Sequence, residues 1–227
     1  TITGYKTTND RVNNTNPFNN NNTIYYNNVI YLKIEISEDV TNLESSDISV
    51  SNGSISEFTS QPSNTYYCKF TPTTDGNYVI SINSGVVNDN LGNINSSAQF
   101  IFIYDTVRPF MTITGYYNSD YTNEIAENTI TNTSGLEVYI KIVCSESTDD
   151  FETSDIVITN GTIELITNTS TIYKYKFTCG DGSSTTTCSI GVPENSFSDS
   201  ATNTNLNNPS NTFSFINDTV APVITEV

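Results

Sequence analysis

The ten residues SDISVSNGSI, from Ser46 to Ile55, return as SDIVITNGTI, from Ser154 to Ile163. Further segments repeat in the same order, TITGY at 1–5 and 112–116 and DTV-x-P at 105–109 and 218–222. Similarity at a fixed offset indicates that one structural unit occurs twice. The sequence therefore predicts a first domain over 1–105, a second over 106–218, and the start of a further linker or repeat over 219–227.

Apolar and polar residues alternate within each copy. The stretch 29–37 alternates along its whole length, and 138–144 repeats the pattern, which is typical of strands buried on one face. Asn52-Gly53 and Asn160-Gly161 each lie between two alternating runs and predict β-hairpins. About seven short strands per copy, separated by turn residues, indicate an immunoglobulin-type sandwich. The predicted fold is all-β, with two tandem Ig-like antiparallel β-sandwich domains.

The charge composition excludes several classes of function. The chain has 8 Lys and Arg against 25 Asp and Glu, a net charge of −17, and no His. Nucleic acids and anionic membranes need basic residues, so we expect neither as a partner. No apolar run is long enough for membrane insertion. Triads that use His are excluded, and the acid pairs that could hydrolyse glycosides lie in turns that repeat with the domains. The sequence thus predicts a protein that is not an enzyme.

The order of SED, SDISVSNGSI, TPTTDGNYVISI, DNLGN and DTVRP resembles the bacterial Ig-like (Big-type) repeats of large surface adhesins. This resemblance covers both copies and implies an extracellular location, at a cell or virion surface. It also implies a rod whose neighbouring Ig-like repeats are the partners of this chain. The first residues, 1–4, already have the pattern of a strand interior, which predicts that the chain is a mature or excised piece of something longer. The second copy departs from the pattern, because 199–203 lacks the glycine that Gly92 supplies in the first, and this predicts an altered loop backbone.

Acidic residues recur at the predicted ends of strands. In an Ig-like sandwich the loop after the second strand and the loop before the last strand lie at the same end, where the incoming linker also arrives. Oxygen ligands from three segments would converge there, as Ca²⁺ requires. The junction set is Asp105, Glu146, Asp199 and Asn203. The equivalent set of the first domain is Glu38, Asp89 and Asn93, and we expect it to be incomplete because its incoming linker is missing from this chain. The alternative is that these residues only shape turns.

The four cysteines have different expected roles. Cys179 and Cys188 both have inward parity on strands that flank one loop, so they could form a disulfide in an oxidising compartment. A zinc pair is disfavoured because the spacing is wrong and His is absent. Cys68 and Cys144 are expected to be buried apolar residues.

Three functions remain open. The first is a structural and adhesive repeat, part of a rod whose junctions are stiffened by Ca²⁺. The second is a module that binds a carbohydrate, or a host or cell-surface receptor, with the Asn-rich stretch 9–28 as its candidate surface. The third is self-association through edge strands, as a subunit of an extracellular filament or surface layer.

Overall fold

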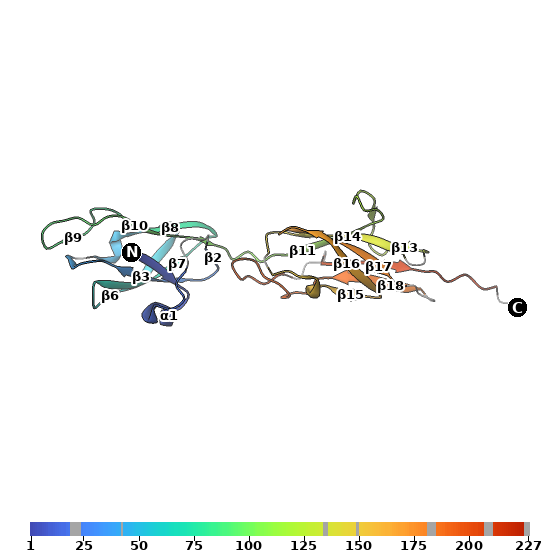
Figure 1. The fold of residues 1–227 in the computed structure, drawn as a ribbon, viewed down its shortest axis with the longest axis horizontal. Helices are drawn as coiled ribbons and strands as arrows, with labels where there is room; N and C mark the ends of the chain where they lie inside the picture. The colour runs from blue at the N-terminus through green and yellow to red at the C-terminus, as the bar shows by residue number, and fades with distance from the viewer. Residues whose placement is uncertain are drawn as a thin grey trace. The chain divides into compact units, whose positions relative to one another are not determined.

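The computed structural model describes residues 1–18, 24–41, 43–133, 136–148, 150–180, 185–206 and 211–224. They form two compact units, Thr1–Val107 and Arg108–Val227. Each unit is built almost entirely of strands (Figure 1).

The first unit is a sandwich of two four-stranded sheets. Its elements are β1 (Ile2–Tyr5), α1 (Thr8–Asn13), β2 (Tyr25–Tyr26), β3 (Ile30–Glu35), β4 (Val40–Thr41), the 3₁₀ turn η1 (Ser45–Asp47), β5 (Ile48–Ser49), β6 (Gly53–Gln61), β7 (Thr65–Pro72), β8 (Gly76–Ile82), β9 (Asn88–Asp89) and β10 (Ala98–Tyr104). One sheet has the order β1-β3-β7-β6 and the other β2-β10-β8-β5, while β4 and β9 form a short ribbon.

The second unit repeats this topology with small additions. Its elements are β11 (Met111–Tyr116), β12 (Glu124–Ile125), β13 (Ile130–Thr131), β14 (Glu137–Cys144), the 3₁₀ turn η2 (Thr153–Asp155), β15 (Val157–Thr159), β16 (Gly161–Asn168), β17 (Ile172–Cys179), β18 (Thr186–Gly191) and β19 (Thr212–Asn217). Its sheets have the orders β12-β11-β14-β17-β16 and β13-β19-β18-β15. Pairing is antiparallel except that β2 runs parallel to β10 and β13 parallel to β19. The predicted all-β, Ig-like fold is confirmed.

Each unit has its own core, formed where the inward residues of its two sheets meet. Ile30 and Leu32 of β3 are fully buried, and so are their counterparts Val138 and Ile140 of β14. The alternation that predicted these strands therefore identifies the core face correctly. Both cores close around a pair of aromatic rings in edge contact, Phe70 with Phe102 and Phe177 with Phe215.

The Asn-Gly pairs do not form the predicted hairpins, and that expectation was wrong. β5 pairs with β8 while β6 pairs with β7, so the chain changes sheets at Asn52-Gly53. β15 and β16 likewise belong to different sheets, since β15 pairs with β18 and β16 pairs with β17. Asn52 and Asn160 have left-handed backbones, with φ of 48° and 54°. Both asparagines therefore have the backbone of a tight turn, as their sequence predicts. The strands before them nevertheless join the opposite sheet, because Ile48 and Ile156 are buried in the core.

The glycine after each of these asparagines is required for space. A Cβ on Gly161 would lie 2.4 Å from the ring of Phe177, and one on Gly53 would lie 2.5 Å from Phe70. We expect Gly161→Ala to destabilise the second unit by about 1–3 kcal/mol, because the ring must leave its place in the core. Gly180→Ala is the matched control, since the nearest atom to its Cβ would be Asn160 O, at an ordinary contact distance of 3.5 Å. Equal unfolding midpoints in urea for the two variants would contradict this packing argument.

The Asn-rich stretch contains a helix that the sequence did not suggest. Thr7 caps α1 by accepting a hydrogen bond from Asp10 N. Arg11, only 8% exposed, donates to the carbonyl of Cys68 at 2.9 Å and lies 4.5 Å above the ring of Tyr67. The helix is thus fixed to the outer face of the first sheet by a buried cation on an aromatic ring. Residues 19–23 of this stretch lie outside the described part of the chain.

The structure joins Cys179 to Cys188, with their Cα atoms 6.0 Å apart. Register places Pro72 and Tyr78 at the equivalent positions of the first unit. There the Tyr78 hydroxyl donates to the carbonyl oxygens of Asn52 and Thr74, at 2.8 and 2.7 Å. This end of the sandwich is therefore cross-linked by a disulfide in the second unit and by the hydrogen bonds of a tyrosine in the first. Cys68 and Cys144 are free and buried, as expected.

Candidate functional site

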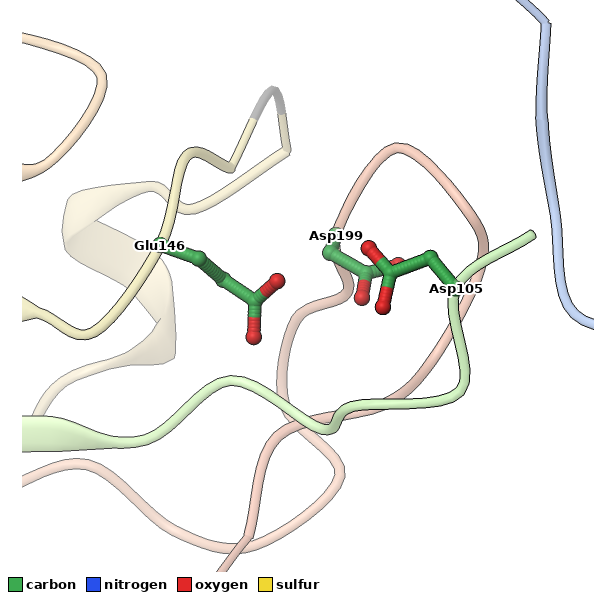
Figure 2. A group of neighbouring side chains, drawn as sticks. All are labelled: Asp105, Glu146 and Asp199. Carbon is green, nitrogen blue, oxygen red and sulfur yellow. The ribbon is translucent and has the colours of Figure 1, made fainter. Parts of the chain in front are cut away.

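Three carboxylates from separate segments form the candidate metal centre. Asp105 belongs to the linker after β10, Glu146 follows β14, and Asp199 lies in the loop between β18 and β19. One carboxylate oxygen from each lies within 4.8 Å of the other two (Figure 2). Asp105 and Glu146 are partly exposed, while Asp199 is buried. Clustered oxygen donors of this kind suit a hard divalent cation.

The loop that carries Asp199 is held by its own carboxylate. Oδ1 of Asp199 accepts hydrogen bonds from the backbone N–H groups of Ala201 and Asn203, at 2.8 and 2.9 Å. Oδ2 accepts from the side-chain amide of Asn203 at 2.9 Å. The carboxylate of Asp199 therefore shapes the turn, and it also belongs to the acidic group. Asn203 would offer its Oδ1 atom to a cation, since Nδ2 is a donor.

The loop of the first unit is nearly identical, which corrects the expectation of an altered backbone. Asp89 accepts from Leu91 N, Asn93 N and Asn93 Nδ2, at 2.8, 2.8 and 2.7 Å. Thr202 takes a left-handed backbone with φ of 71°, where Gly92 has 89°. The carboxylate hydrogen bonds fix the turn strongly enough to hold a threonine in this unfavourable region.

The three residues predicted as ligands in the first unit border one groove. Glu38, Asp89 and Asn93 all line one groove of about 600 Å³. The hydrogen bonds from the side chain and backbone of Asn93 lower the pKa of Asp89 below its usual value. Asp89 is therefore ionised throughout the neutral range, as a cation ligand must be.

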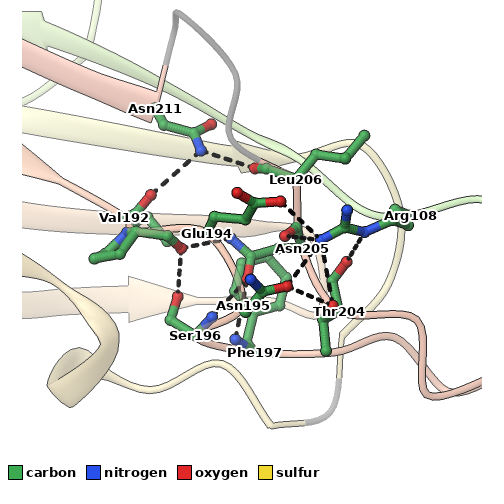
Figure 3. A network of polar contacts seen from close by, with 11 residues as sticks. Arg108, Val192, Glu194, Asn195, Ser196, Phe197, Thr204, Asn205, Leu206 and Asn211 are labelled. Atoms are coloured by element: carbon green, nitrogen blue, oxygen red, sulfur yellow. Dashed lines mark hydrogen bonds and ion pairs between the residues drawn. The ribbon is translucent and has the colours of Figure 1, made fainter.

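Arg108, the first residue of the second unit, lies at the centre of a network of polar contacts (Figure 3). Its Nε donates to Thr204 O at 2.7 Å, and one terminal nitrogen donates to Asn205 O at 2.8 Å and to Asn195 Oδ1 at 2.9 Å. The same nitrogen lies 3.2 Å from Glu194 Oε1. Leu206 N donates to the carbonyl of Pro109 at 2.8 Å. Residues 108 and 109 are thus anchored to the loop that follows Asp199.

A buried asparagine supports this loop from inside. Asn205 is fully buried, and its amide donates to Pro193 O at 2.7 Å while its oxygen accepts from Ser196 N at 2.8 Å. Asn95 has the same role in the first unit, donating to Asn83 O and accepting from Val87 N. Each asparagine satisfies backbone groups that a loop cannot pair by itself.

Asp150 supports the Asp199 loop from the other side. It accepts from Ser198 N at 2.9 Å, from Ser198 Oγ at 2.6 Å and from Thr148 Oγ1 at 3.0 Å. Partial burial opposes its ionisation, but the hydrogen bonds from Ser198 outweigh this and lower the pKa of Asp150.

This lowered pKa predicts how stability depends on pH. A carboxyl whose pKa is lower in the folded state stabilises the fold above its unfolded value of about 3.8, and the stabilisation disappears as the pH falls through the folded value. We expect Asp150→Asn to lower the melting temperature at neutral pH and to flatten its decline below about pH 4. Asp120→Asn, on an exposed residue bonded to Thr122, is the control. A pH profile unchanged by Asp150→Asn would refute this role.

Sequence reasoning missed Arg108, Asp150 and Asn205. The repeat contained a signal for Asn205, because Asn95 occupies the equivalent position. Arg108 has no such signal, since Ala221 stands at its place in the second DTV-x-P segment.

Comparison with known proteins identifies related domains. The family model described as bacterial Ig-like domain matches residues 17–102 and 105–215. The solved structure of Yersinia pseudotuberculosis InvD is 16% identical with a TM-score of 0.34, over 86% of this chain and 54% of that one. That of the Y. pseudotuberculosis adhesin InvE is 12% identical with a TM-score of 0.27, over 86% and 56%. The chain thus spans about half the length of either structure. No curated protein matches it. Among the described residues, no helix has the length and apolar character that crossing a membrane requires.

Proposed function

The chain belongs to the family of bacterial Ig-like domains, and on this basis we propose that it is a structural and adhesive repeat region of a large surface protein. Its two units are consecutive domains of a rod at a cell or virion surface. Its partners are the neighbouring repeats of the same polypeptide and a glycan or protein on the opposing surface. The role is mechanical and adhesive and involves no catalysis.

The grouping of Asp105, Glu146 and Asp199 carries the mechanical part of the proposal. A Ca²⁺ ion held by these carboxylates and by Asn203 would bind the linker to two loops of the second unit. In the first unit, Glu38, Asp89 and Asn93 are the corresponding ligands. Coordination would replace the mutual repulsion of the carboxylates with attraction to one cation. The linker would then lose backbone freedom, which stiffens the rod.

The disulfide between Cys179 and Cys188 supports an extracellular location, because such a bond persists in oxidising compartments.

Calorimetric titration with Ca²⁺ tests the proposed site. We expect a binding heat in the wild type and a marked loss of affinity in Glu146→Gln, which keeps the shape of the side chain and removes its charge. Ca²⁺ at about one hundred times its Kd should stabilise the protein by about 2.7 kcal/mol, and EDTA should abolish this gain.

Glu127→Gln is the matched control, because Glu127 is an exposed glutamate outside the acidic group. It should leave both the binding heat and the Ca²⁺-dependent stability unchanged. If the wild type gives no heat and melts at the same temperature in Ca²⁺ and in EDTA, the carboxylates only shape turns.

A further inference from the structure

The lysines of the second unit all lie on the outer face of one sheet. Lys141 is on β14, and Lys174 and Lys176 are on β17, where each alternates with residues buried in the core. The chain as a whole is strongly acidic, with a net charge of −17. Basic residues gathered on one face of such a protein create a local positive potential that attracts anions.

Two of these lysines are not neutralised by the protein. Lys176 pairs with Glu137 and Glu164, at 3.4 and 3.3 Å. Lys141 and Lys174 form no ion pair with any of the described residues, and they lie directly opposite each other across β14 and β17. Directly opposed like charges destabilise a sheet. An anion bound between the two ammonium groups would remove this repulsion.

The equivalent face of the first unit has neither feature. Register places Lys33 where the second unit has Lys141, and Lys33 lies opposite Tyr67 instead of another lysine. The Lys33 ammonium pairs with Glu35 at 2.7 Å. Val143 stands at the position of Glu35, so the second unit has lost this acidic partner. The pair of unneutralised lysines is therefore a property of one copy and not of the repeat.

Tyrosine rings lie beside the two lysines. The ring centroid of Tyr121, between β11 and β12, lies 4.3 Å from the Lys174 ammonium. It lies 5.5 and 6.3 Å from the ring centroids of Tyr116 and Tyr139. Tyr121 has a left-handed backbone with φ of 59°, and its buried hydroxyl has no hydrogen-bond partner in the described part of the chain. A bulky residue in this region is strained, and such strain is concentrated at ligand-binding sites.

The composition of this face favours a saccharide over a protein as the ligand. Two rows of residues cross the sheet here without an aliphatic side chain, and they are Tyr116, Tyr139, Lys176 and Glu164 in one row and Thr114, Lys141, Lys174 and Thr167 in the other. The core of a protein interface is depleted in charged residues, whereas a pair of lysines is central here. Ammonium and hydroxyl donors suit the carboxylate and hydroxyl oxygens of an acidic sugar. The tyrosine rings add apolar surface against which a sugar ring can pack.

We propose that the face formed by Lys141, Lys174 and Tyr121 binds a saccharide that carries a carboxylate group. The carboxylate lies between the two ammonium groups, and the sugar ring packs against the tyrosine. This inference rests on the proposed adhesive function, and it names the chemistry of the glycan on the opposing surface. No calcium ion takes part in the contact, so binding does not depend on the proposed metal centre.

An array of hyaluronan, alginate and sialyllactose, each beside its carboxyl-reduced form, tests the proposal with the full chain in EDTA. We expect the wild type to bind carboxylated saccharides and not their reduced forms. Lys141→Gln should weaken this binding by about tenfold or more, because a charge-assisted hydrogen bond is lost. Lys33→Gln is the matched control, since it removes the same charge from the equivalent position of the first unit. A wild type that binds no carboxylated saccharide, or binds the reduced forms equally well, overturns the proposal.

Val143→Glu is a second test, because it restores the acid that Glu35 supplies in the first unit. The new carboxylate should pair with Lys141 and weaken binding as far as Lys141→Gln does. Val143→Gln, which adds a similar side chain without the charge, should keep the affinity of the wild type. Melting curves show that each variant is folded. Equal affinities for Val143→Glu and Val143→Gln would contradict an electrostatic contact at this face.

Two further results separate this inference from the proposed function. Tighter binding to polyglutamate than to any saccharide would assign the face to an acidic protein and overturn the proposal. If saccharide binding fails while the Ca²⁺ titration gives its expected heat, this inference is wrong and the mechanical role of the rod stands.

Discussion

Phe177→Ala should lower the free energy of unfolding of the second unit by about 3–5 kcal/mol. Phe177 is fully buried, its ring centroid lies 5.8 Å from that of Phe215, and it covers Gly161. Removing the ring leaves a cavity that Gly161 cannot fill, so the site has little capacity to collapse. Urea denaturation of the full chain measures the loss.

Leu165→Ala is the control within the same sheet, because Leu165 on β16 is 45% exposed. It should cost less than about 1 kcal/mol, since nearly half of its surface stays in water in the folded state. Phe70→Ala should reproduce the large effect in the first unit, where the equivalent ring covers Gly53. Equal losses for Phe177→Ala and Leu165→Ala would show that the repeated Gly–Phe contact does not organise the core.

The double variant Cys179→Ala, Cys188→Ala should lose about 2–3 kcal/mol of stability. The disulfide closes a loop with a sequence separation of 9 residues, and such a link restricts the unfolded chain. The second unit should then melt about 8–12 °C lower. Calorimetry in the presence and absence of a reductant measures this shift.

The reductant supplies an internal control for the disulfide. It should lower the melting temperature of the wild type as far as the double variant does, and it should not affect the variant. The first unit has Tyr78 in this place and should melt unchanged. A wild type insensitive to reductant would contradict a stabilising role for the disulfide.

The repeat and its alternating residues were enough to predict the fold class and the core. They could not predict which sheet each strand joins. Asn52-Gly53 has the sequence of a hairpin turn, yet the choice between hairpin and crossover depends on whether Ile48 is buried against the same sheet or the opposite one. Contacts far apart in sequence decide this, and the turn residues do not encode it.

The candidate site was predictable where its residues recur and unpredictable where they do not. Asp89 and Asp199 recur in matching loops, which drew attention to them. The replacement of glycine by Thr202 led to the wrong expectation of an altered loop. The hydrogen bonds of Asp199 keep the left-handed backbone at this position even without glycine. Arg108 was missed because its partners are backbone carbonyls of a distant loop, which leave no trace in the sequence.

The central claim is that Ca²⁺ stiffens the linker, and a distance distribution tests it most directly. Spin labels on Thr59→Cys and Thr167→Cys would report one distance between β6 and β16, both at exposed positions. The two free cysteines, Cys68 and Cys144, are buried and do not compete for the label, since burial raises the pKa of both thiols, that of Cys68 to about 12. We expect Ca²⁺ to narrow the distribution in the wild type and to leave that of Glu146→Gln broad. A wild-type distribution equally broad in Ca²⁺ and EDTA would contradict the account.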